Sequence, residues 1–335
     1  MTTELHDEET LAFRDLSPDR VLNAVESHGY RCDGQLLPLN SYENRVYRIG
    51  LEDGSFIISK FYRPHRWSDE AIGEEHDFSW QLADAEIPIV PPIRNDGGDT
   101  LLQLGAHRFA LFPYHGGRAP DFDNLEQIEQ LGRFLGRLHA VGSVENFQHR
   151  PALDIDTFGE SAYRFVLDTH FIPNELELPY RSLVEDLLKQ VRWCYERAGE
   201  VELIRLHGDC HGGNILWTDE GPHIVDLDDT RHAPAVQDMW MFLSGERADQ
   251  TQCLDALLEG YSVFRQFDAR QLHLIEALRT LRLIHYYAWI AQRWDDPAFP
   301  RAYPWFNTQR CWEQHILDLR EQAALMNEPP LEWHG

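Results

Sequence analysis

Two carboxylates and one amide stand at a spacing that suits phosphoryl transfer. Asp209 and Asn214 lie within residues 206–217, and Asp226 follows twelve residues after Asn214. Transfer from ATP needs a carboxylate that accepts or orients the incoming hydroxyl, and a hard cation on oxygen ligands that bridges the phosphates. We therefore predict Asp209 and Asp226 as catalytic residues, and Asn214 and Asp226 as ligands of Mg²⁺, with ATP as co-substrate.

Short elements around these residues are expected to position them. Gly212 and Gly213 allow a tight turn after Asp209. Residues 215–217 and 224–225 are predicted strands, and a hairpin through 218–222 would bring Asn214 and Asp226 together. Asp228 could join the metal site or hold the loop together, and metal contact is the preferred interpretation.

Further polar residues near the motif are expected to hold it in shape. His207 and His211 flank Asp209, and we expect them to brace the loop rather than to bind zinc. Asp238 is predicted to anchor the backbone of the same loop.

The first third of the chain predicts a small antiparallel sheet with one packed helix. Hydrophobic periodicity predicts helices over 19–28 and 68–84, the second with Ser68 as N-cap. Strands are predicted over 35–39, 45–49, 55–61, 100–104 and 108–113, with a proline-rich connector over 87–93.

Mostly helical sequence follows Gly116 and Gly117. Helices are predicted over 124–141, 178–198, 251–266, 270–293 and 308–327. The expected fold is α/β (α+β), with two lobes as in protein kinases. Residues 1–115 would form a nucleotide-binding β lobe, and residues 116–335 a helical lobe with the catalytic loop and the acceptor site.

The spacing is similar to the H-x-D-x-x-x-x-N pattern of protein kinases, which a metal-binding Asp follows. His207, Asp209, Asn214 and Asp226 match it. The glycine of D-F-G, the A-P-E triplet and the G-x-G-x-x-G loop are missing, and residues 40–44 stand in place of that loop. The chain thus resembles the aminoglycoside-phosphotransferase-like branch, with its HGDxHxxN and (I/V)xDx(D/E) motifs.

The kinase pattern implies further nucleotide contacts. Lys60 ends the third strand, where kinases place the lysine that grips the phosphates. Its acidic partner should come from the next helix, and Glu75 is preferred over Glu74 and Glu70 because it shares the inner face with Phe78 and Leu82. Residues 113–115 should form the hinge beside adenine, with Tyr114 contributing backbone groups.

Five segments resemble the bacterial stress response kinase A family: residues 39–47, 60–64, 207–211, 225–229 and 234–238. The resemblance runs from about residue 10 to the end. It implies a cytoplasmic serine/threonine protein kinase, with Asp209 as proton acceptor, Asn214 and Asp226 as magnesium ligands, and Ser41 in contact with ATP.

Net charge and cysteine content indicate which classes of binding partner and which cellular compartment to expect. The net charge of −26 argues against nucleic acid and against anionic membranes, and it would attract cationic partners. Five cysteines without a CxxC pair indicate a reducing compartment, and the first ten residues lack a signal peptide. We expect a cytoplasmic monomer that phosphorylates a protein Ser or Thr. A small-molecule kinase for an amino alcohol, sugar or aminoglycoside, and a silent nucleotide-binding scaffold, are the alternatives.

Overall fold

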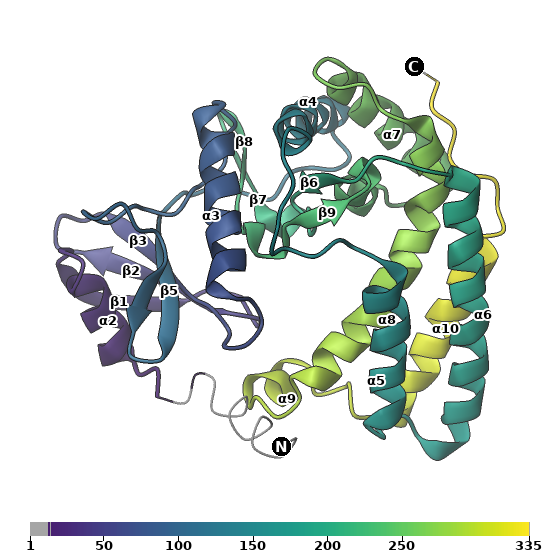
Figure 1. Cartoon of the computed structure of the whole chain (residues 1–335), viewed down its shortest axis with the longest axis horizontal. Helices are drawn as coiled ribbons and strands as arrows, with labels where there is room; N and C mark the ends of the chain where they lie inside the picture. Colours follow the sequence, from purple (N-terminus) through teal and green to yellow (C-terminus); the bar gives the residue numbers. More distant parts are fainter. Residues whose placement is uncertain (1–12, 14, 335) are drawn as a thin grey trace. The chain divides into compact units, whose positions relative to one another are not determined.

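The computed structural model describes residue 13 and residues 15–334, so the expectation about a signal peptide in residues 1–10 lies outside the described part (Figure 1). The chain forms two compact units. The first combines the described residues up to Ala119 with Gln148–Arg150 and Ile215–Asp228, and the second holds Pro120–Phe147, Pro151–Asn214 and the residues from Asp229 onward. The boundary predicted after residue 115 stays a prediction. Among the described residues, no helix is long and apolar enough to cross a membrane.

The first unit is built on a five-stranded antiparallel sheet, as the sequence predicted. The strand order is β1-β2-β3-β5-β4. The strands are β1 (Cys32–Pro38), β2 (Arg45–Leu51), β3 (Phe56–Phe61), β4 (Leu102–Leu104) and β5 (His107–Pro113). Helices α2 (Pro18–Glu26) and α3 (Asp69–Asp84) also match their predictions, and Ser68 caps α3 by accepting from the backbone N–H of Ala71.

Alternation along β3 gives the two faces of the sheet different neighbours. Ile57 and Phe61 pack with Val21 of α2 in one buried cluster. Tyr62 packs with Ile72 of α3 in another. Since side chains two residues apart share a face, Lys60 lies on the same face as Tyr62, beneath α3.

A two-stranded hairpin completes the first unit. It consists of β7 (Ile215–Thr218) and β8 (Gly221–Ile224), with Ile215 opposite Ile224. The strand predicted over 224–225 was wrong in its position, because pairing begins at Gly221 after a two-residue turn. The hairpin thus starts one residue after Asn214 and ends two residues before Asp226. Backbone hydrogen bonds join it to the connector at Val90 and to the segment at Arg118.

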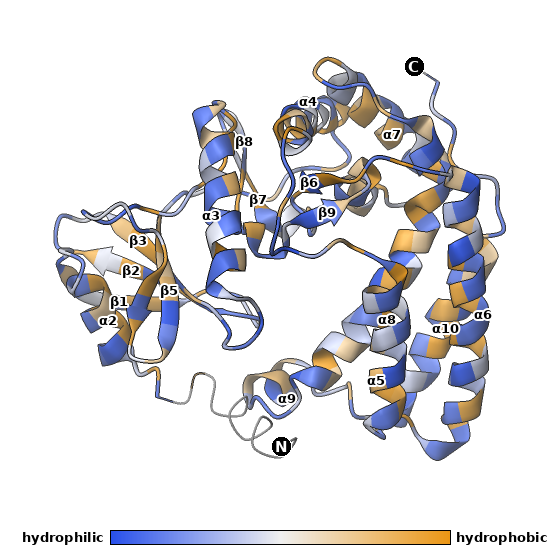
Figure 2. Ribbon diagram, viewed as in Figure 1, coloured by the Kyte–Doolittle hydropathy of each residue, from blue (hydrophilic) through white to orange (hydrophobic). Residues whose placement is uncertain are grey.

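Helices dominate the second unit. They are α4 (Leu125–Gly142), α5 (Ala162–Asp168), α6 (Asn174–Ala198), α7 (Arg247–Ser262), α8 (Ile275–Gln292), α9 (Ala298–Ala302) and α10 (Gln309–Leu325), with the short strand pair β6 (Ile204–Leu206) and β9 (Arg231–Ala233). The long helices were predicted from their amphipathic pattern. Figure 2 shows this pattern as orange hydrophobic and blue hydrophilic residues that recur along α6 and α10.

Some boundaries differ from the prediction for local reasons. Helix α7 begins earlier than residue 251 because Glu246 and Asp249 form a capping box. The helix predicted over 270–293 is divided, since a 3₁₀ turn over Ala269–Leu274 precedes α8. Helices α5 and α9 were not predicted.

Two glycine contacts bring α4 and α7 close together. A Cβ atom on Gly132 would lie 2.0 Å from the carbonyl oxygen of Leu257, and one on Gly260 would lie 2.0 Å from that of Glu129. Only glycine permits this approach, which places α4 and its residue His139 firmly in the core.

Candidate active site

The loop that carries Asp209 is anchored by a fully buried carboxylate. Asp238 accepts hydrogen bonds from the backbone N–H groups of His207 and Gly208, each at 2.8 Å. Asp238 Oδ2 also lies 3.1 Å from His139 Nε2 on α4. The prediction that Asp238 anchors the loop backbone is confirmed.

Gly208 makes the turn into this loop possible. Its φ is +87°, and an added Cβ atom would lie 2.1 Å from the carbonyl oxygen of Asp229. Gln237 donates from Nε2 to the carbonyl oxygen of Gly208 at 2.9 Å. Position 208 therefore requires glycine for two reasons: the backbone has a positive φ, and a side chain would collide with the carbonyl oxygen of Asp229.

Both oxygens of the Asp209 carboxylate face a basic side chain. Arg282 Nη1 on α8 lies 2.5 Å from Oδ1, and His211 Nε2 lies 3.5 Å from Oδ2. Burial alone would raise the pKa of Asp209, but the hydrogen bond from His211 and the charge of Arg282 outweigh it and lower the pKa. Asp209 therefore stays ionised.

Asn214 and the two loop histidines brace the same turn. Asn214 donates from Nδ2 to the carbonyl oxygen of Asp209 at 3.0 Å, which leaves Oδ1 as the side-chain atom able to hold a cation. His207 Nδ1 accepts from the backbone N–H of Asp209, and His211 Nδ1 accepts from that of Gly213. The histidines act as loop braces, as expected. No cluster of three or more His, Cys, Asp or Glu suited to a metal occurs in the described part of the chain.

In the first unit, Lys60 lies among three carboxylates. Its Nζ atom is 3.2 Å from Glu75 Oε1, 2.9 Å from Asp226 Oδ1 and 3.1 Å from Asp228 Oδ1. Burial opposes the charge of Lys60, but these carboxylates together raise its pKa well above the ordinary value. Of the three candidate acids on α3, the structure brings Glu75 to Lys60. Glu74 instead accepts from the backbone N–H groups of residues 148–150.

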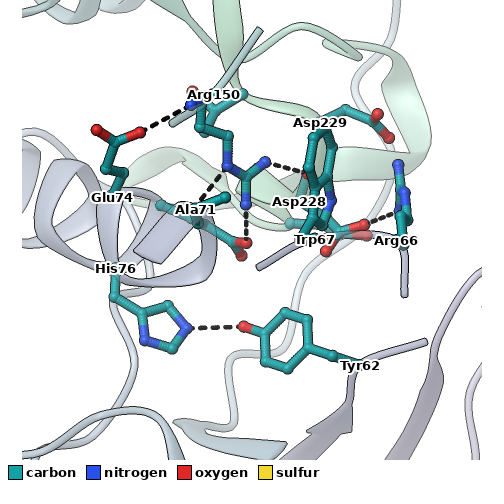
Figure 3. A network of polar contacts seen from close by, with 12 residues as sticks. Tyr62, Arg66, Trp67, Ala71, Glu74, His76, Arg150, Asp228 and Asp229 are labelled. Atoms are coloured by element: carbon teal, nitrogen blue, oxygen red, sulfur yellow. Dashed lines mark hydrogen bonds and ion pairs between the residues drawn. The ribbon is translucent and has the colours of Figure 1, made fainter. Parts of the chain in front are cut away.

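Two arginines contact the acidic residues that neighbour Lys60. Figure 3 shows Arg150 beside Ala71 and Asp228, and Arg66 on Asp228. Arg150 donates to Glu75 Oε2 at 2.8 Å, to the carbonyl oxygen of Asp228 at 2.5 Å and to that of Ala71 at 2.7 Å. Arg66 pairs with the carboxylate of Asp228. Sequence reasoning missed both arginines, because neither lies in a motif and Arg150 contacts partners more than 70 residues away.

Asp226 and Asp228 have different surroundings. The Asp226 side chain is 42% exposed, whereas that of Asp228 is 5% exposed and enclosed by Lys60 and Arg66. Asp226 also has a φ of +64°, which a residue with a side chain rarely adopts. Asp226 thus presents an accessible carboxylate at a strained position, while Asp228 braces the network.

The remaining predicted nucleotide residues lie in loops that adjoin strands of the sheet. Ser41 belongs to the β1–β2 loop, where its backbone N–H donates to the carbonyl oxygen of Leu39. Asn44, at the end of this loop, accepts from the backbone N–H of Arg63 at 3.0 Å. Tyr114 follows β5, and its ring packs edge-on against Phe56. Their contacts with ATP stay predictions.

Comparison with known proteins places the chain in a family. The model of the phosphotransferase enzyme family matches residues 35–275. Stress response kinase A of Escherichia coli strain K12 is 42% identical over 320 residues, which cover 96% of each chain. The chain belongs to the stress response kinase A family. Another member is the serine/threonine protein kinase RdoA of Salmonella typhimurium strain LT2, at 41% identity and the same coverage.

The fold of this stress response kinase A family member is also found among solved phosphotransferases. The structure of amicoumacin kinase hAmiN in complex with AMP-PNP, Ca²⁺ and Ami has a TM-score of 0.72 and 18% identity, and the match covers 93% of this chain and 94% of that one. The predicted family and fold are thus confirmed, and the chain is an ATP-dependent phosphotransferase.

The site residues fall into two groups within this enzyme of the stress response kinase A family. Lys60, Glu75 and Asp226 meet in the first unit. Asp209 and Asn214 meet in the second. That both groups act on one nucleotide stays a prediction. Arg282 was not anticipated either, since only the tertiary structure brings α8 to the catalytic loop.

Proposed function

We propose that the chain transfers the γ-phosphoryl group of ATP, with Mg²⁺ as the metal ion, to a serine or threonine hydroxyl of a protein. One observation supports this most: Lys60 is buried but remains charged, held 3.2 Å from Glu75 and 2.9 Å from Asp226. A fixed ammonium group beside an exposed carboxylate suits a ligand that carries both phosphate and a cation. The serine/threonine kinase name of the relative RdoA supports the protein acceptor.

The proposed roles follow from the surroundings of each residue. Lys60 and the backbone around Ser41 would hold the phosphates, and the backbone at Tyr114 would face adenine. Glu75 keeps Lys60 in place, since it is itself held by Arg150 at 2.8 Å. These side chains are positioned before ATP arrives, so little ordering is required when it binds.

Asp226 in the first unit and Asn214 in the second are each of a chemical kind that binds magnesium. Asp226 offers an exposed carboxylate and Asn214 an amide oxygen, and Mg²⁺ prefers a few such oxygens together with phosphate oxygens and water. When bound, the ion would neutralise charge on the phosphate oxygens. Asp226 would hold this ion through its carboxylate, next to Lys60.

Asp209 would direct the acceptor in the chemical step. The acceptor hydroxyl oxygen forms a bond to the γ-phosphorus, and the bond from that phosphorus to the oxygen of ADP breaks. The hydroxyl proton passes to the Asp209 carboxylate. The lowered pKa of Asp209 keeps it ionised and able to orient this hydroxyl.

Labelled ATP provides the test. Purified protein is incubated with radiolabelled ATP and Mg²⁺ alone, with a generic protein, and with a panel of metabolites. Label on the chain itself or on the added protein is expected, and Asp209→Ala should lower it by orders of magnitude. Transfer to metabolites alone would contradict the protein acceptor, and no transfer to any acceptor would contradict kinase activity.

A small-molecule acceptor is the second candidate, since the net charge of −26 would attract a cationic alcohol. A cytoplasmic location and a monomeric state remain proposals. The cysteines, all free in the described structure, agree with a reducing compartment, and sedimentation would test the oligomeric state.

A further inference from the structure

A cationic side chain lies directly on the predicted proton acceptor. Arg282 Nη1 is 2.5 Å from Asp209 Oδ1, and both residues belong to the second unit. Arg282 comes from the second turn of α8, 73 residues beyond Asp209. Because Asp209 would meet the acceptor hydroxyl, the guanidinium group of Arg282 borders the position of that hydroxyl.

Arg282 can contact a second group without leaving Asp209. Its side chain is 42% exposed, whereas that of Asp209 is 22% exposed. The contact uses Nη1, and a planar guanidinium group can bind a further oxygen through its other nitrogen atoms. His211, on the other oxygen of Asp209, is 41% exposed. Two accessible donors therefore border the carboxylate, and they outweigh the opposing charge of Asp229, which pairs with Arg231 at 2.7 Å.

We propose that Arg282 binds an anionic group beside the reacting hydroxyl, so that the acceptor is a Ser or Thr flanked by carboxylate or phosphate groups. This inference rests on the proposed function and names its substrate class. Arginine pairs with carboxylate and phosphate through strong, oriented hydrogen bonds. A cationic group at the same position would instead be repelled by Arg282.

The net charge of the whole chain opposes a preference for anionic acceptors. With a net charge of −26, the long-range field favours cationic acceptors. That field is largely screened beyond about 8 Å at physiological salt. Contacts at the site act within that distance, so the Arg282 contact would decide which acceptor reacts.

Anion binding would also prepare the chemical step. Once an acceptor carboxylate or phosphate shares Arg282, the hold of the guanidinium group on Asp209 weakens. The released Asp209 oxygen can then accept a hydrogen bond from the hydroxyl whose oxygen bonds to phosphorus as ADP leaves. Acceptors without the anion would meet a carboxylate still held by Arg282.

A peptide series tests the proposal. Wild-type protein with radiolabelled ATP and Mg²⁺ is given serine peptides flanked by Asp or Glu, by phosphoserine, by Ala, or by Lys or Arg. We expect kcat/KM to be about 10- to 100-fold higher for the first two sets than for the Ala set, the size of a charged hydrogen bond. The first two sets distinguish carboxylate from phosphate as the anion.

Variants assign the preference to Arg282. Arg282→Gln should reduce the ratio of kcat/KM between acidic and Ala peptides to about 1, and Arg282→Lys should restore part of it. Arg320→Gln removes one exposed arginine from α10 and should leave the ratio unchanged. Circular dichroism checks folding, and the Lys variant carries the test should the Gln variant fail to fold.

Several outcomes would overturn the inference. One is a wild-type enzyme with no preference or a preference for basic peptides. Another is an Arg282→Gln variant that lowers kcat/KM equally for all peptides, because Arg282 would then only position Asp209. If no peptide reacts, hydroxy acids and amino alcohols are compared. Preference for hydroxy acids would uphold the anionic acceptor while the protein acceptor fails, and preference for amino alcohols would refute both.

Discussion

Lys60 Nζ lies 2.9 Å from Asp226 Oδ1, and this contact joins the end of β3 to a residue 166 positions later in the chain. Lys60 is buried, but Asp226 is half-exposed and has left-handed backbone geometry. The contact with Lys60 thus holds the carboxylate of a residue whose backbone is strained, and such strain clusters at active sites.

Replacement of Asp226 should separate activity from stability. Asp226→Gly removes the carboxylate but suits a φ of +64°, so we expect loss of activity by orders of magnitude with a melting temperature that is unchanged or raised. Asp226→Ala should lose activity equally and be less stable than Asp226→Gly by about 1 kcal/mol. Labelled phosphate transfer and thermal unfolding measure the two effects.

The exposed Asp219 in the β7–β8 turn offers a matched control. Asp219→Asn removes a carboxylate from the same hairpin and should leave phosphotransfer intact. Normal turnover in folded Asp226→Gly would refute the assigned role of Asp226.

Lys60 should support both ATP binding and stability. Lys60→Met leaves Glu75, Asp226 and Asp228 close together without their shared cation, so ATP affinity should fall and stability should drop by about 3 kcal/mol. In the double variant Lys60→Met/Glu75→Gln, stability should partly recover, since one buried charge is removed, but ATP affinity should not. Calorimetric ATP titration and urea unfolding test this, and unchanged ATP affinity in Lys60→Met would count against its phosphate role.

Gly208 should tolerate no side chain. Gly208→Ala adds a Cβ atom 2.1 Å from the carbonyl oxygen of Asp229 at a φ of +87°, so the loop must shift and turnover should fall at least tenfold. Gly221→Ala is the control, because Gly221 has a φ of +113° with no atom within 4 Å of the added Cβ. That variant experiences backbone strain alone. Equal turnover in the two variants would show that the close contact does not matter.

Two buried histidines should make the fold sensitive to mild acid. Burial lowers the pKa of His76 to about 3 and that of His315 to about 3. Below the ordinary value of 6.5 the unfolded chain binds protons that the folded chain does not, so stability is lost as pH falls from 6.5 toward 3. The loss is about 1.4 kcal/mol per pH unit for each histidine, or about 2 kcal/mol each at pH 5.

A variant isolates the contribution of His315, which is stacked on Tyr287 with ring centroids 3.5 Å apart. His315→Phe keeps an aromatic ring but does not titrate. Its loss of stability between pH 7 and pH 5, measured by urea unfolding, should be about 2 kcal/mol smaller than that of the wild type. An identical loss in both proteins would contradict the assignment.

The sequence predicted those parts of the site that depend on a motif or on local periodicity. The kinase pattern placed Lys60 at the end of β3, helical spacing placed Glu75 on the inner face of α3, and the two side chains meet at 3.2 Å. The contacts of Arg150 and Arg282 could not be predicted, because each arginine lies outside any motif and contacts residues more than 70 positions away. Neither the π-helical turn over Asp156–Ser161 nor the adjoining helix α5 was predicted. Hydrogen bonds between residues i and i+5 in the π-helical turn interrupt the 3.6-residue hydrophobic period on which the prediction depends.

The first unit draws its residues from three separate stretches of the chain, the last of which is Ile215–Asp228. During synthesis on the ribosome, its sheet is complete at Pro113, but Asp226, a partner of Lys60, is added more than a hundred residues later. An early nascent chain therefore contains Lys60 and Glu75 without the hairpin that pairs with Val90 and Arg118. A truncated product that ends near residue 119 would lack Asp226 and would be a poor tool for nucleotide-binding studies.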